Sequence, residues 1–211
     1  MRSFLENRKF IENEFQHACF DETTGKSAEE LYFELSKMQD ESCDAPDRER
    51  FCAEAYAYLL RNMQFEINEH TPFSVKFNIG IDYSGFASID IYDKAIFRNQ
   101  RVKVLSEKLL CEYKKMCELE STGVCDVYSD FWHTVPDWNN VIRLGFSGIL
   151  KNARDKKQSL LEGGKYTDKN IWFLDSVIIC FEAMIRCMER MYGYSLKFDM
   201  PEFSTALKNI T

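Results

Sequence analysis

The chain has 211 residues, of which 45% are hydrophobic, and its formal net charge is -7 at pH 7. This length and apolar content suffice for one domain with a hydrophobic core, and the acidic balance argues against a nucleic-acid or anionic-membrane partner. The amino-terminal residues are charged, and no apolar run approaches the length of a membrane span, so we expect a cytoplasmic protein. The eight cysteines lie within helical patterns, which favours reduced thiols over disulfides.

The first part of the chain predicts three helices and then extended structure. A helical pattern covers residues 4–18, and a second one over 27–38 begins with a Ser-Ala-Glu-Glu capping box. A third begins near Pro46, because proline suits the first turn of a helix. Over residues 65–92 hydrophobic residues alternate with polar or small ones. This period predicts a small extended or two-stranded segment.

The second part predicts longer helices. They cover residues 100–119, then 137–161 with Asp137 as the capping residue, and then 167–192. A last helical pattern starts at Pro201. The helix over 167–192 is apolar nearly all round in its middle, so we expect it to be central and the most buried. The fold class is therefore predicted as mostly α, with a single domain over residues 1–211.

Two glycines within the helix over 137–161 carry a packing prediction. Gly145 and Gly148 lie three residues apart, where each one costs helix propensity. We expect that they allow a neighbouring backbone to pack closely.

The loop before that helix is the best candidate for a ligand-binding edge, because it gathers aromatic and ionisable residues at a helix start. Its pocket candidates are Asp130, Trp132, His133 and Asp137. His133 would hydrogen-bond an oxygenated substrate or move a proton, or else only bond a backbone carbonyl. Asp137 would line the pocket or only cap the helix, and Trp132 would wall the pocket or only pack in the core.

Charged residues within the apolar helix predict structural ion pairs. Glu182 lies among apolar residues, and we expect it to form a buried pair with Arg186 or with Arg143. No Cys-x-x-Cys or His-x-x-x-His spacing occurs, so no metal site is predicted. Cysteines at helical spacing among leucine and isoleucine indicate core packing.

Three stretches resemble the N-terminal part of glycyl radical enzymes of the pyruvate formate-lyase type. That family often has a histidine, a Pro-Asp-aromatic triplet and a helix reading Leu-Gly-x-x-Gly-Ile, as in His133-Thr-Val-Pro-Asp-Trp-Asn-Asn-Val-Ile-Arg-Leu-Gly-Phe-Ser-Gly-Ile-Leu150. Residues 173–190 are similar to its buried helix with a Glu-Ala-x-Ile core and a trailing arginine, and residues 58–63 are similar to a third landmark. The resemblance spans residues 45–195, between amino-terminal helices at 1–44 and the start of another helix at 196–211.

The resemblance implies the N-terminal helical region of an α/β barrel. It also implies radical cleavage or formation of C–C, C–O or C–N bonds in a small organic substrate. Lyase and acyltransferase members, such as formate C-acetyltransferase, are anaerobic enzymes. Their cofactor is a protein glycyl radical, which a separate S-adenosylmethionine-dependent activating enzyme installs.

The sequence departs from the family at the reactive residues. No glycine lies in an exact Arg-Val-x-Gly-Tyr motif, and no cysteine lies in the context of the family's catalytic loop. We therefore expect no catalytic residue and no cofactor in this chain, which would be inactive when isolated. It would meet a small-molecule substrate only together with the remaining enzyme chain, and the activating enzyme is a further possible partner. The alternative is a non-catalytic helical module that binds another protein.

Overall fold

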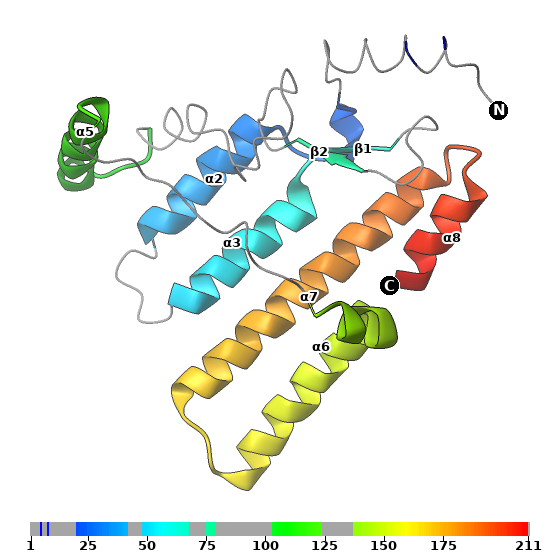
Figure 1. Cartoon of the computed structure of the whole chain (residues 1–211). Coiled ribbons are helices and arrows are strands. Elements are labelled where there is room, and N and C mark those ends of the chain that lie inside the picture. Colours follow the sequence, from blue (N-terminus) through cyan, green and yellow to red (C-terminus); the bar gives the residue numbers. More distant parts are fainter. Residues whose placement is uncertain are drawn as a thin grey trace.

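The structure is a computed structural model that describes Leu5, Arg8 and residues 20–41, 48–67, 75–78, 103–123 and 137–210. This part of the chain is mostly helical, as the sequence predicted (Figure 1). Of the predicted amino-terminal helix only Leu5 and Arg8 are described. The elements are η1 (Glu22–Thr24), α2 (Ala28–Glu41), α3 (Arg48–Asn62), β1 (Phe65–Glu66), β2 (Lys76–Phe77), α5 (Glu107–Ser121), α6 (Trp138–Gly163), α7 (Asp168–Ser195) and α8 (Pro201–Ile210).

Helix α7 is the central element. It runs between α3 and α6, and α8 folds back beside its carboxyl-terminal end (Figure 1). Its fully buried side chains lie four residues apart on one stripe, at Ala183, Cys187, Met191 and Ser195. The predicted central position is confirmed. However, the other apolar side chains in the middle of α7 are only half-buried, because α3 and α6 do not cover the whole circumference.

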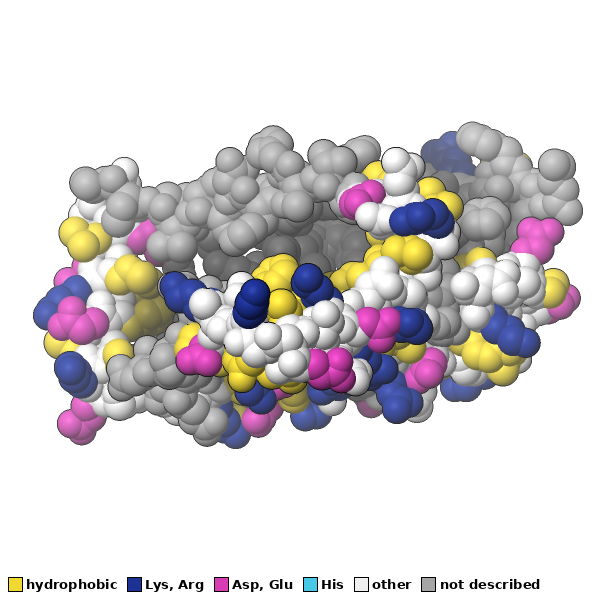
Figure 2. Space-filling model, turned by 90° about the horizontal axis from the view of Figure 1, so that it is seen from below, with side chains coloured by type: hydrophobic (Ala, Val, Ile, Leu, Met, Phe, Trp, Pro, Cys, Tyr) yellow, Lys and Arg dark blue, Asp and Glu magenta, His cyan; other side chains and the backbone are white. Residues whose placement is uncertain are grey.

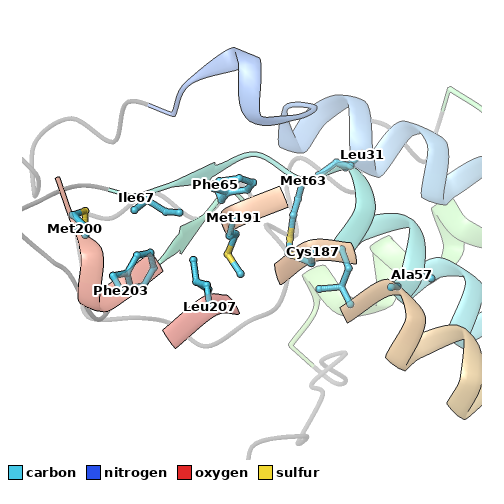
Figure 3. Close-up of a cluster of buried hydrophobic side chains, with 12 residues drawn as sticks. Leu31, Ala57, Met63, Phe65, Ile67, Cys187, Met191, Met200, Phe203 and Leu207 are labelled. Atoms are coloured by element: carbon cyan, nitrogen blue, oxygen red, sulfur yellow. The ribbon is translucent and has the colours of Figure 1, made fainter. Parts of the chain in front are cut away.

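The core lies at the carboxyl-terminal half of α7. Phe65 and Ile67, at β1 and just after it, are 1% and 2% exposed. The Phe65 and Tyr194 rings are nearly perpendicular, with 5.5 Å between their centroids. Burying one such side chain contributes roughly 1.5–3 kcal/mol. Figure 3 shows that the cluster draws on α2, α3, β1, α7 and α8, through Leu31, Ala57, Met63, Phe65, Ile67, Cys187, Met191, Met200, Phe203 and Leu207.

A short antiparallel ribbon joins this core to α3. Strands β1 and β2 pair Phe65 with Phe77. This confirms a two-stranded segment within the predicted range. The second predicted run, over residues 87–92, lies outside the described residues.

Helix starts follow the predicted capping signals. The backbone N–H of Ser27 donates to the Glu30 carboxylate at 2.9 Å, and the N–H of Glu30 donates to Ser27 Oγ at 3.3 Å. Thr167 and Asn170 form the same reciprocal arrangement at the start of α7. Such caps satisfy backbone donors that have no partner inside the helix.

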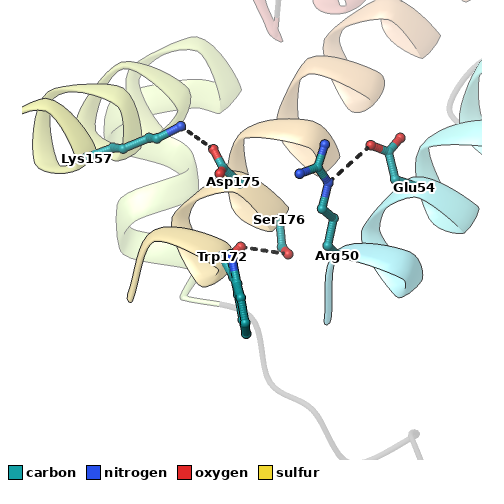
Figure 4. A network of polar contacts seen from close by, with 6 residues as sticks. All are labelled: Arg50, Glu54, Lys157, Trp172, Asp175 and Ser176. Atoms are coloured by element: carbon teal, nitrogen blue, oxygen red, sulfur yellow. Dashed lines mark hydrogen bonds and ion pairs between the residues drawn. The ribbon is translucent and has the colours of Figure 1, made fainter. Parts of the chain in front are cut away.

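Polar contacts join α6 to α7 at the end that is remote from the core. Lys157 Nζ lies 2.5 Å from Asp175 Oδ1, and both side chains are half-buried (Figure 4). The next residue of α7, Ser176, donates from Oγ to the Trp172 carbonyl oxygen of the same helix at 2.9 Å (Figure 4). On α3, Arg50 and Glu54 form a looser pair at 3.9 Å. The Lys157–Asp175 pair therefore links the two long helices at this end.

The two glycines of α6 differ in the roles that the structure gives them. Gly145 has φ 64° and ψ 177°, so it kinks the helix. The atoms nearest to a Cβ on Gly148 belong to Leu144 of the same helix. At Gly148 the prediction of a closely packed neighbouring backbone is therefore wrong. At Gly145 the glycine serves the bend, because other residues rarely adopt this backbone conformation.

Helix α5 contributes little to the described core. None of its residues is buried, and it stands at one edge of the molecule in Figure 1. None of the described helices is both long enough and apolar enough to cross a membrane.

Candidate functional site

Of the pocket candidates in the loop, the structure describes only Asp137. Asp130, Trp132 and His133 lie outside the described residues, so their proposed contact with a ligand stays a prediction. Asp137 caps α6: its carboxylate accepts from the Asn140 N–H at 3.2 Å and from Asn140 Nδ2 at 2.6 Å. Both carboxylate oxygens thus face the first turn of the helix, which is the capping role.

The first two turns of α6 expose apolar side chains beside that cap. Trp138 is 59% exposed and Ile142 is 81% exposed. They lie four residues apart and therefore share one face of the helix. The face of the molecule in Figure 2 likewise shows hydrophobic side chains between charged ones of both signs.

The partner that was predicted for Glu182 is wrong. Glu182 Oε1 lies 2.6 Å from Arg154 Nη2, so the ion pair joins α7 to α6. Arg186 pairs instead with Glu189 at 3.0 Å, and Arg143 donates to the Asn140 amide oxygen at 2.9 Å. The antiparallel register of α6 and α7 brings Arg154, rather than Arg143, beside Glu182. The Arg154–Glu182 and Arg186–Glu189 pairs are both exposed, so each contributes about 0–1 kcal/mol to the free energy of unfolding.

These ion pairs border a groove between α3, α6 and α7, which we call the arginine groove. One hollow of about 470 Å³ is lined by Arg61, Leu150, Arg154, Glu182, Ile185, Arg186 and Glu189. A second hollow of about 480 Å³ shares Arg61, Arg186 and Glu189 with the first and reaches Arg190. Sequence reasoning missed this groove, because its arginines come from three helices and form no local motif.

Arg190 closes one end of the groove and faces the core. Its guanidinium donates to the carbonyl oxygens of Leu60 at 2.8 Å and Met63 at 3.0 Å, and also to that of Thr24. It lies 5.3 Å from the centroid of the Phe65 ring. Burial lowers the pKa of Arg190, although the group stays charged at neutral pH. Arg190 therefore holds η1 and the end of α3 against α7.

Of the described cysteines, Cys180 and Cys187 fit the predicted packing role, whereas Cys52 and Cys111 are exposed. Burial raises the pKa of the Cys180 and Cys187 thiols, which keeps both of them protonated at neutral pH. Within the part of the chain that the structure describes, no three His, Cys, Asp or Glu residues gather as a metal-binding group.

The comparisons with known proteins place the chain in a family. A family model described as pyruvate formate lyase-like matches residues 80–204. Neither a curated protein nor a solved structure matches the chain. The matched range includes α5, the kinked α6 and the whole of α7. It covers more than half of the 211 residues. The chain therefore belongs to the pyruvate formate lyase-like family.

Proposed function

We propose that the chain is the N-terminal, helical, substrate-side region of a glycyl-radical-type enzyme. The observation that carries this proposal is the family match over residues 80–204. The reaction would be radical cleavage or formation of a C–C, C–O or C–N bond in a small organic substrate, under anaerobic conditions in the cytoplasm.

The reactive residues would come from polypeptide outside these 211 residues. The sequence holds no exact Arg-Val-x-Gly-Tyr motif that could carry the glycyl radical, and the similar stretch Arg190-Met-Tyr-Gly-Tyr194 lies within helix α7. In the assembled enzyme a separate S-adenosylmethionine-dependent activase would install that radical. Within this chain the loop with Asp130, Trp132 and His133 would form one wall of the substrate pocket, next to the capped start of α6.

The test compares the isolated chain with the chain plus any polypeptide that is encoded downstream of it. The DNA downstream of codon 211 is sequenced first, and any open reading frame with a cysteine loop and a C-terminal glycine motif is co-expressed. Anaerobic activation should then give a glycyl radical signal in electron paramagnetic resonance, and His133→Ala should reduce turnover. The isolated chain should give neither signal nor turnover. Radical turnover by the isolated 211-residue chain would contradict the proposal.

The exposed apolar residues of α6 and α7 could meet either the rest of an enzyme or a different protein, so the second candidate function is a non-catalytic module that binds another protein. Ile142 is 81% exposed and Phe173 is 61% exposed. A stand-alone module of this kind would be monodisperse in sedimentation and would unfold cooperatively. A region that is built to pack against more of an enzyme would associate and bind a hydrophobic dye.

A further inference from the structure

The arginine groove concentrates positive charge on an acidic protein. Its lining includes four arginines, Arg61, Arg154, Arg186 and Arg190, but only two glutamates, Glu182 and Glu189. The groove therefore has an excess of two positive charges, whereas the whole chain has a net charge of -7. A local excess of this kind attracts anions to one place on a surface that otherwise repels them.

The two glutamates orient two of these arginines. Glu182 holds Arg154 at 2.6 Å, and Glu189 holds Arg186 at 3.0 Å. Each guanidinium has five N–H donors, so one carboxylate contact leaves several of them available. Because the pairs already restrict these side chains, an incoming ligand orders them at a lower entropic cost.

Arg61 is a groove arginine that has no acidic partner among the described residues. It lies in the last turn of α3 and is exposed. Among the described residues it forms no ion pair, and it lines both hollows together with Arg186. The planar fork of an arginine matches two oxygens of a carboxylate or phosphate.

We propose that the arginine groove binds the oxyanion group, a phosphate or a carboxylate, of a small molecule. Arg61 and Arg186 hold the oxyanion, and Arg154 supports it from α6. The apolar side chains of Leu150 and Ile185 line the same hollow and accept a short aliphatic portion of the ligand. This assignment does not depend on radical chemistry, so it stands or falls separately from the proposed function.

The test measures binding of inorganic phosphate and of hexanoate to the purified 211-residue chain by calorimetry, at constant ionic strength set with chloride. We expect saturable binding of at least one probe. Phosphate alone would indicate a phosphorylated ligand, and hexanoate alone would indicate an aliphatic carboxylate. Failure of both probes to bind would overturn the proposal.

Variants locate the binding. Arg61→Gln should weaken binding roughly tenfold or more, because a charge-assisted hydrogen bond is lost. Arg61→Lys keeps the charge without the fork and should weaken binding less. Lys151→Gln is the matched control, since it removes one positive charge from an exposed pair on α6 outside the groove. Equal binding by Arg61→Gln and Lys151→Gln would overturn the assignment, and circular dichroism melts confirm that each variant is folded.

Discussion

Arg190 donates to the main-chain oxygens of Thr24, Leu60 and Met63, and so connects α7 to two distant segments. Replacing Arg190 by leucine leaves these carbonyls without their charged donor at a half-buried position. We expect the free energy of unfolding to fall by roughly 2–4 kcal/mol. Urea denaturation measures the change. Arg186→Leu is the matched control on the same helix, and it should cost less than about 1 kcal/mol because its pair is exposed.

A second prediction at the residue scale concerns Tyr194 and Asp21. Burial, together with the hydrogen bond to Asp21 at 2.8 Å, raises the pKa of Tyr194 to about 12 from the ordinary value of 10.0. The folded state then keeps a proton that the unfolded state releases, so this contribution is complete below pH 10 and disappears as the pH rises through 12. Asp21→Asn should move the tyrosine pKa back toward 10.0.

Subtracting the ultraviolet titration of Tyr194→Phe from that of the wild type gives the pKa of Tyr194 alone. The same subtraction between Asp21→Asn with and without Tyr194→Phe gives its pKa when the carboxylate is absent. An unchanged pKa of Tyr194 in Asp21→Asn would contradict the role given to the carboxylate.

Thr23 also donates to Asp21 through its backbone and its hydroxyl. These bonds, with that from Tyr194, hold the pKa of Asp21 below its ordinary value.

At the scale of the element, the kink in α6 yields a comparison of two glycines. Gly145 has φ 64° and ψ 177°, a region that residues with a Cβ almost never occupy. Gly145→Ala should therefore destabilise the protein by roughly 1–3 kcal/mol. Gly163, in the last turn of the same helix, has open space around a Cβ. Gly163→Ala should stabilise by roughly 0.4–1 kcal/mol. Thermal unfolding of both variants tests the pair, and equal effects would rule out the kink as the cause.

The same helices show what the sequence could predict and what it could not. The starts at Ser27, Asp137 and Thr167 were predictable, because capping depends on residues three apart in the chain. The bend at Gly145 was not, since a glycine in an apolar pattern is compatible with both a straight and a kinked helix. The partner of Glu182 was also not predictable, because Arg154 reaches it only through the register between two helices.

At the scale of the whole molecule, the sequence predicts the place of one helix but not a surface that several helices build together. The long apolar run of α7 predicted its central position, because such a helix must be covered on several sides. The arginine groove needed the actual fold, since Arg61 comes from α3 whereas Arg154 and Arg186 come from α6 and α7. No single stretch of the sequence therefore predicts the groove, because it depends on how three helices pack together.

The uncovered apolar surface supports the last prediction. Ile142 and Phe173 are 81% and 61% exposed, and the middle of α7 is only half-buried. Apolar surface of this kind marks a contact with more protein. We expect the purified chain to bind a hydrophobic dye and to associate in sedimentation. The double variant Ile142→Ser, Phe173→Ser should reduce both, while its unfolding free energy changes by less than about 1 kcal/mol because both side chains are exposed. Lys169→Ser, an exposed change on α7, is the control and should alter neither property. A monodisperse wild-type chain that binds no dye would instead favour the stand-alone helical module.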